Sequence, residues 1–232
     1  MEPTIQNAID EGNLWALAHT QVLESIERAI AMYGEARVGL AGGSTPKHLY
    51  ELLARDALPW EKITWVLIDE RYVPSADAES NLGMLEEALF EPAQVPQENI
   101  VFFDTTLSTE ESAQAMSNKI TALENVRKPI FDLLILGAGS DGHIASLFED
   151  DQKLFTTQKA YTTSAPESYK TKTRLTLSLG TLTDAQLGML ILKGKEKEQV
   201  LSTLKNTDSQ SAMALRHLSQ KVPLEIFTYF GS

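Results

Sequence analysis

The chain has 232 residues, of which 43% are hydrophobic, so it is large enough to bury a sizeable core, and a disordered protein is excluded. Its 20 basic and 32 acidic residues give a net charge of −12 without a basic run, which argues against a nucleic-acid partner but still allows a local site for an anionic small molecule. The absence of cysteine excludes disulfides, thiolate zinc sites and thiol nucleophiles, and it is typical of a reducing compartment.

The N-terminal segment, residues 1–14, has no basic start followed by an apolar stretch, so no signal peptide is predicted. The chain also contains no run of about 18 apolar residues, the length that a membrane-spanning helix needs. We therefore expect a cytoplasmic protein without a membrane partner.

Helical and extended patterns alternate along the chain. Apolar residues recur at helical spacing from Leu14 to Met32, whereas short apolar runs bounded by glycine or charge are typical of buried strands. The predicted helices cover residues 14–32, 45–54, 81–89, 108–124, 196–205 and 212–218. The predicted strands cover residues 37–42, 63–69, 99–103, 130–137, 173–179, 187–194 and 224–230, with a further strand-like part within 158–168.

Two of the predicted helices carry start signals. Thr45 is placed to act as an N-cap with Pro46 in the first turn, and Ser108 with Glu111 forms a capping-box pattern. Strands that alternate with helices predict an α/β fold, with a mostly parallel sheet covered by helices on both faces. No shift in composition marks a boundary, so we expect a single domain over residues 1–232.

Ligands of such sheets bind at the carboxyl ends of the strands. The first candidate strand end is AGGSTP, residues 41–46, where Gly42 and Gly43 allow close approach of a ligand and Ser44 and Thr45 offer hydroxyl groups. The following helix N-terminus suits a phosphate, although the Walker pattern is absent. An ordinary strand-to-helix turn with a capping threonine explains the same residues equally well.

The second candidate strand end is DERYVP, residues 69–74. Asp69, Glu70 and Arg71 follow an apolar strand directly. Three adjacent charges are often only solvated surface, but their position at the ligand-binding edge of the sheet makes them candidates for a site.

The third candidate strand end is GAGSDGH, residues 137–143, in which Gly137, Gly139 and Gly142 spell the dinucleotide fingerprint. A dinucleotide loop normally follows the first strand and is flanked by small apolar residues. Here the loop lies past mid-chain, and Asp141 and His143 flank its third glycine. We therefore do not predict a nicotinamide cofactor, and no other cofactor is expected.

His143 is a candidate general base, because a neutral imidazole near pH 7 can take a proton from water. It is one of four histidines and is expected at a strand-to-helix junction, although a surface-loop histidine would look the same. A rival interpretation takes Ser140 as a nucleophile in an elbow-like A-x-S-x-G run, with His217 as its distant base. No histidine or carboxylate cluster has metal-ligand spacing, so no metal site is predicted.

Basic residues would hold an anionic ligand. Arg174 opens a predicted strand, while Lys193, Lys195 and Lys197 cluster at a predicted strand-to-helix turn. Arginine can clamp a phosphate with two hydrogen bonds and lysine acts as a point charge. Lys195 is expected to be an ordinary surface lysine.

Taken together, these motifs resemble the 6-phosphogluconolactonase family. The pieces that carry the resemblance occur in the family's order from Gly42 to Lys197: GGSTP, DERYVP followed by Ser80–Asn81, GAGSDGHIASLF, RLT and GKEK. Two departures are the Glu149 that follows ASLF, where the family often has proline, and SAMAL in place of a late Pro-Ala-Ser. The second leaves the C-terminal wall of the pocket, near residues 209–218, undefined.

The resemblance implies a NagB/RpiA/CoA-transferase type of α/β fold and hydrolysis of 6-phospho-D-glucono-1,5-lactone to 6-phosphogluconate, in the oxidative pentose phosphate pathway. It implies that His143 is the general base and that a small sugar-phosphate lactone is the partner, with the protein a monomer or a small homo-oligomer. The implied phosphate-binding groups are the GGSTP loop with Gly42, Gly43, Ser44 and Thr45, together with Arg174 and Lys197. The implied residues at the sugar-acid end are Asp69, Arg71, Asn81 and Asp141, with Gly139 also lining the substrate site.

Two alternatives remain. The related glucosamine-6-phosphate deaminase group shares the sugar-phosphate loop and the DGHIA run, but it has a glutamate five residues after the histidine. In this chain that position is Phe148, and Glu149 comes one residue later. A non-catalytic sugar-phosphate sensor would keep the phosphate loop and Arg174 but would have no need of His143.

Overall fold

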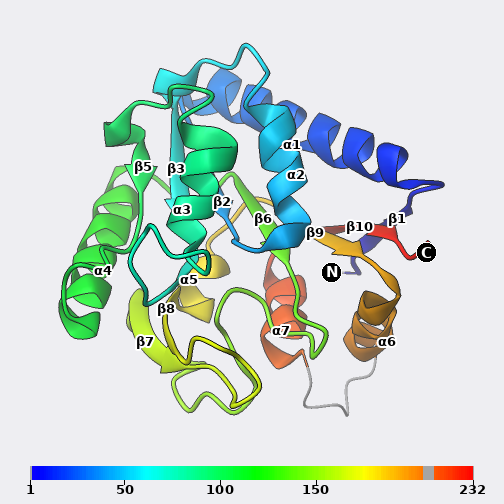
Figure 1. The fold of residues 1–232 in the computed structure, drawn as a ribbon. Coiled ribbons are helices and arrows are strands. Elements are labelled where there is room, and N and C mark those ends of the chain that lie inside the picture. The colour runs from blue at the N-terminus through cyan, green and yellow to red at the C-terminus, as the bar shows by residue number, and fades with distance from the viewer. Residues whose placement is uncertain (1, 206–211, 232) are drawn as a thin grey trace.

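The computed structural model describes residues 2–205 and 212–231 and is built around a seven-stranded parallel sheet (Figure 1). Every described strand pair in this sheet is parallel. In spatial order the strands are β1 (Thr4–Asn7), β10 (Leu224–Tyr229), β9 (Gly188–Lys193), β6 (Leu133–Gly137), β2 (Ala36–Leu40), β3 (Ile63–Leu67) and β5 (Ile100–Val101). The predicted α/β class with a mostly parallel sheet is confirmed.

Helices cover both faces of this sheet. One face packs against α1 (Glu11–Tyr33), α2 (Ser44–Leu53) and α3 (Asn81–Leu85), which continues into a π-helical turn over Glu86–Phe90. The other face packs against α4 (Thr109–Val126), α5 (Leu179–Leu182), α6 (Glu198–Lys205) and α7 (Met213–Lys221). No helix among the described residues is both long and apolar enough to cross a bilayer.

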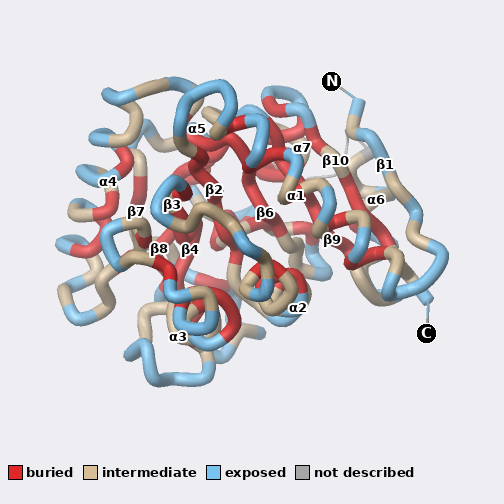
Figure 2. Tube along the Cα trace, turned by 90° about the horizontal axis from the view of Figure 1, so that it is seen from above, coloured by how far each residue is buried: buried red, intermediate tan, exposed pale blue. Residues whose placement is uncertain are grey.

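The strands read as continuous apolar runs because both of their faces are buried. In and just after β3, Trp65 and Leu67 contribute to the core under α1 and α2, whereas Val66 and Ile68 contribute to the core on the opposite face. Figure 2 shows the same arrangement, with the buried trace concentrated in the central strands and the exposed trace at the periphery.

A second, three-stranded antiparallel sheet consists of β4 (Asp69–Arg71), β8 (Thr173–Leu177) and β7 (Ala160–Ser164). The sequence predicts one strand over residues 63–69, but the chain leaves the main sheet after Leu67. The Ile68 N–H still donates to Leu40, while its carbonyl accepts from Leu177 at the end of β8. The charged triplet 69–71 is therefore a short strand rather than a loop.

Helix termini agree with the sequence only in part. Ser108 and Glu111 form the predicted capping box at the start of α4. The prediction of Thr45 as an N-cap is wrong, because α2 begins one residue earlier and Gly43 occupies the cap position with φ 97° and no side-chain cap. The short elements β1 and α5 were not predicted.

Candidate active site

A pocket of about 350 Å³ opens at the carboxyl ends of β9, β6, β2 and β3, which are neighbours in the sheet. From β2 the chain continues to β3 and β5 on one side and later returns to β6 on the other, so the switch in strand order lies beside β2, where open α/β sheets bind ligands. All of the predicted site residues except Asp141 line this pocket: Gly42, Gly43, Ser44, Thr45, Asp69, Arg71, Asn81, Gly139, His143, Arg174 and Lys197.

The N-terminus of α2 forms one wall of the pocket. Since α2 has no side-chain cap, the backbone N–H groups of Ser44 and Thr45 have no capping partner, and both residues line the pocket. Gly42 is required by close packing, because a Cβ atom there would lie 1.8 Å from Oδ1 of Asn81. The buried Tyr50 hydroxyl donates to the Ala41 carbonyl at 2.7 Å and holds this turn against the helix. A helix N-terminus without a side-chain cap can accept an anion, and here it opens into the pocket.

The loop after β6 does not lead into a helix, contrary to the strand-to-helix junction that the sequence predicts. It folds back on itself, with the Gly139 N–H donating to the His143 carbonyl at 2.9 Å and the Gly142 N–H donating to the Gly139 carbonyl at 3.0 Å. Gly142 has a φ of 87°, a conformation that favours glycine. A dinucleotide fingerprint needs a helix N-terminus at this point, so the three glycines serve a different turn.

His143 and Asp141 form a hydrogen-bonded pair in this loop. Nδ1 of His143 lies 2.6 Å from Oδ1 of Asp141, while Nε2 of His143 has no protein partner among the described residues. Burial acts to raise the pKa of Asp141, but the hydrogen bonds and charge of His143 outweigh it, and the net shift of the pKa is downward. Asp141 is therefore the carboxylate that orients the imidazole, and the unpartnered nitrogen is available for proton transfer.

Strand alternation separates the three charges of the Asp69–Arg71 strand. Asp69 and Arg71 line the pocket, whereas the fully buried Glu70 points away and accepts hydrogen bonds from the backbone N–H groups of Asn81 and Leu82 at 2.8 and 2.7 Å. Burial raises the pKa of Glu70, against these N–H bonds, which lower it. Glu70 thus holds the start of α3 and places Asn81 in the pocket, a role that the sequence did not reveal.

The Asp69 carboxylate forms hydrogen bonds with residues other than His143. Its carboxylate accepts from the Ser146 hydroxyl at 2.7 Å and from the Asn81 side-chain amide at 3.4 Å. The same amide also donates to the Asp69 carbonyl at 2.9 Å. These bonds tie β4, α3 and the loop after β6 together at the pocket wall.

Two arginines face each other across the antiparallel pair of β4 and β8, since Arg71 is the register partner of Arg174. Like charges placed opposite each other are destabilising. Burial and the neighbouring Arg71 lower the pKa of Arg174, while Asp69 acts in the opposite direction. Nε of Arg71 is buried without a hydrogen-bond partner, and an unpaired buried donor is costly unless a ligand supplies the acceptor.

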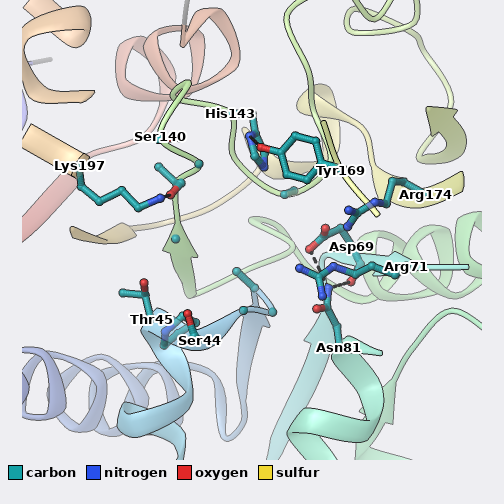
Figure 3. Close-up of a pocket in the computed structure, with 18 residues that line it drawn as sticks. Ser44, Thr45, Asp69, Arg71, Asn81, Ser140, His143, Tyr169, Arg174 and Lys197 are labelled. Carbon is teal, nitrogen blue, oxygen red and sulfur yellow. Dashed lines mark hydrogen bonds between the residues drawn. The ribbon is translucent and has the colours of Figure 1, made fainter. Parts of the chain in front are cut away.

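Lys197 approaches from the opposite side of the pocket, from a 3₁₀ turn over Lys195–Lys197, and its Nζ donates to the Ala138 carbonyl at 2.8 Å. Figure 3 shows Lys197 with Ser44 and Thr45 on one side of the pocket and Arg174 with Arg71, Asp69 and Asn81 on the other. Three basic side chains line the pocket against one carboxylate, so its local charge opposes the net negative charge of the chain.

The structure does not support Ser140 as a nucleophile. Ser140 lines the pocket, but it lies in the irregular loop rather than on a strand-to-helix elbow. Its proposed base, His217, packs edge-on against Phe155 at 5.4 Å between ring centroids. Across residues 2–205 and 212–231, no group of three or more histidine, aspartate or glutamate side chains is arranged to hold a metal ion.

Tyr169 is a pocket residue that the sequence analysis missed. It lies between β7 and β8 in a stretch without hydrophobic periodicity, so no local pattern marks it. The wall expected near residues 209–218 is described only in part, because residues 206–211 lie outside the described residues. Ala212, which belongs to this wall and is described, packs against Gly142. A Cβ atom added to Gly142 would lie 2.6 Å from Cβ of Ala212.

Both the sequence and the fold are similar to those of known proteins. Residues 10–225 match the family model for glucosamine-6-phosphate isomerases/6-phosphogluconolactonase. The chain is 34% identical to a 6-phosphogluconolactonase of Synechocystis sp. over 88% of this chain and 85% of the relative, and 32% identical to one of Thermotoga maritima over 89% and 91%. A 6-phosphogluconolactonase crystal structure from Thermotoga maritima superposes with a TM-score of 0.85 at 28% identity, covering 97% of this chain and 99% of that one.

Proposed function

Because the chain belongs to the glucosamine-6-phosphate isomerase/6-phosphogluconolactonase family, we propose that it hydrolyses 6-phospho-D-glucono-1,5-lactone to 6-phosphogluconate, as a step of the oxidative pentose phosphate pathway. The observation that carries the proposal is the hydrogen-bonded pair of His143 and Asp141, which leaves Nε2 of His143 free. His143 lines the same pocket as the uncapped N-terminus of α2 and three basic side chains. A base and an anion site in one pocket suit a phosphorylated ester.

Binding of the substrate phosphate orients the lactone in the pocket. The N–H and hydroxyl groups of Ser44 and Thr45, together with Lys197, bind it from one wall, and Arg174 reaches the same group from the opposite wall. Binding at a point remote from C1 fixes the lactone in the pocket and places its carbonyl for attack.

The chemical step is addition of water to the C1 carbonyl. Nε2 of His143 takes a proton from water while the water oxygen bonds to C1, and Asp141 stabilises the imidazolium that forms. The carbonyl electrons move to oxygen, where Arg71 and loop N–H groups stabilise the oxyanion. Collapse of the tetrahedral intermediate breaks the bond from C1 to the ring oxygen, and the imidazolium returns its proton to that oxygen. Deprotonation of the released acid to solvent completes the reaction.

The residue at position 148 argues against the deaminase alternative. The related group has a glutamate at this position, whereas Phe148 is 4% exposed and packs on the His143 ring with centroids 4.7 Å apart. Glu149, the next residue, is exposed. The buried aromatic ring leaves no carboxylate from this segment beside the histidine.

A parallel assay tests the proposal. Freshly prepared 6-phosphogluconolactone and glucosamine 6-phosphate are offered to the protein, and release of acid and release of ammonia are followed, each corrected for the rate without protein. We expect acid release from the lactone and no ammonia from the amino sugar. Ammonia release would establish the deaminase alternative, and binding of both compounds without turnover would establish a sensor.

A further inference from the structure

Tyr169 is directed into the pocket from an otherwise exposed connection. Its backbone N–H donates to the Pro166 carbonyl at 3.0 Å, and this turn lies between β7 and β8. The neighbouring residues 166–168 and 170 are exposed, whereas Tyr169 is partly buried and lines the pocket (Figure 3). A large aromatic side chain in this position contacts the groups that the proposed reaction uses.

The Tyr169 ring closes one side of the His143 imidazole. The two rings meet edge-on at 84°, with centroids 5.6 Å apart. Phe148 contacts both rings, at 4.7 Å from the imidazole centroid and 5.6 Å from the phenol centroid. The imidazole therefore sits in a corner between two aromatic rings, which restricts its rotation.

The Tyr169 hydroxyl lies 3.4 Å from Nδ1 of His143, but this nitrogen donates its hydrogen to Asp141 and cannot accept another one. The Asp141 carboxylate, 2.6 Å from the same nitrogen, is the acceptor that remains for the phenol. Burial raises the pKa of Tyr169, and the negative charge of Asp141 and a hydrogen bond to it raise the pKa further, against Arg174 and Arg71, which lower it. The phenol thus stays neutral and keeps its hydrogen to donate.

We propose that Tyr169 is a positioning residue of the Asp141–His143 pair: its hydroxyl donates to the Asp141 carboxylate, and its ring holds the imidazole so that Nε2 remains available to the pocket. The consequence for turnover rests on the proposed function, whereas the contact with the pair does not. A hydroxyl that donates to Asp141 withdraws part of the negative charge that would otherwise stabilise a protonated imidazole.

The hydroxyl and the ring can be separated by Tyr169→Phe, which keeps the ring. Asp141 lies beside the imidazole, and the charged groups that line the pocket with His143 are Asp69, Arg71, Arg174 and Lys197. Tyr169→Phe changes none of them, so the loss of the hydroxyl alone leaves Asp141 a stronger partner for the imidazolium. The imidazole should then remain protonated to higher pH.

A matched control lies on the same hairpin. Tyr161 on β7 also donates its hydroxyl to an aspartate, Asp151 at 2.9 Å, but it does not line the pocket. Tyr161→Phe therefore removes the same chemical group without touching the pair.

The direct test is an NMR titration of the imidazole ring of His143, whose signal among the four histidines is identified by its loss in His143→Ala. We expect Tyr169→Phe to move the titration midpoint to higher pH and Tyr161→Phe to leave it in place. In the lactonase assay Tyr169→Phe should lower kcat about 2- to 13-fold, the effect of one hydrogen bond, with KM nearly unchanged. The acid limb of its pH profile should move in the same direction as the ring titration.

An unshifted midpoint in Tyr169→Phe overturns the inference, whatever the activity. A shift of equal size in both variants also overturns it, because the effect would then be a general loss of packing. A shift confined to Tyr169→Phe in a protein without lactonase activity supports the contact while refuting the proposed function, so the two failures are distinguishable.

Discussion

Nδ1 of His143 lies 2.6 Å from Oδ1 of Asp141, and both side chains occupy the space that a Cβ atom on Gly139 would need. A single tight loop after β6 therefore carries the proposed base, the carboxylate that binds it and the glycine that gives them room. Because Nδ1 is bound to Asp141, the proposed mechanism uses Nε2 for proton transfer.

Removing the charge of Asp141 should shift the pH dependence of catalysis. The pKa of Asp141 is lowered, so its carboxylate stays ionised while the pH falls into the range where imidazole takes up a proton. Asp141→Asn removes the negative charge that favours the protonated ring, so the acid limb of kcat/KM should move to lower pH. kcat should also fall by about tenfold or more, because the ring is no longer held in one tautomer. The exposed Asp150→Asn is the control, and an acid limb that moves to higher pH would refute the assignment.

Gly139→Ala should disable the site while leaving the fold intact. A Cβ atom at this position would lie 2.2 Å from Nδ1 of His143 and 2.3 Å from Oδ1 of Asp141, so both side chains must move. We expect a large loss of kcat with an unchanged thermal unfolding midpoint. Gly180→Ala is the matched control, because the nearest atom to its Cβ lies 3.8 Å away. Full activity in Gly139→Ala would show that the pair has no fixed role.

The anion site can be tested by comparing Lys197 with Lys195, because both lysines lie in the same 3₁₀ turn. Lys197 lines the pocket, whereas Lys195, two residues earlier, is exposed and does not line it. Lys197→Ala should raise KM for the lactone about 10- to 100-fold, the effect of one charge-assisted hydrogen bond, and Lys195→Ala should not. Equal effects from the two substitutions would indicate only a general attraction between the protein surface and an anion.

Arg174→Ala should act chiefly on binding. Arg174 lines the pocket, and in the proposed function it binds the substrate phosphate from the wall opposite Lys197. We expect KM to rise about 10- to 100-fold with a smaller change in kcat, and Arg174→Lys to restore part of the affinity as a point charge. Steady-state kinetics at constant ionic strength measure both quantities. An unchanged KM would remove Arg174 from the substrate site.

The parts of the site that local sequence predicts are those that end a strand. Ser44, Asp69 and His143 each follow an apolar run closely, and the parallel sheet brings such strand ends to one edge. Their common location in one pocket therefore follows from strand periodicity alone. The assignment of residues to the phosphate end or to the sugar-acid end of the substrate comes from the family resemblance, and it stays a prediction.

The parts that the sequence does not predict depend on contacts between distant segments. β4 exists because Asp69–Arg71 pairs with β8 more than 100 residues later, and a local pattern of three charges gives no sign of it. Tyr169 reaches the pocket only because the β7–β8 connection folds over the loop after β6. The irregular path of that loop replaces a helix that its glycine spacing suggested, since its N–H groups bond within the loop.

The measurement that tests the central claim most directly is the comparison of catalysis and ligand binding in His143→Ala. If Nε2 of His143 takes the proton from water, kcat for 6-phosphogluconolactone falls by about 10²–10⁴-fold, while the Kd for 6-phosphogluconate, measured by calorimetry, stays near that of the parent protein. If the variant instead binds 6-phosphogluconate poorly and retains the parent kcat at saturating lactone, His143 is a binding residue and the proposed mechanism is wrong.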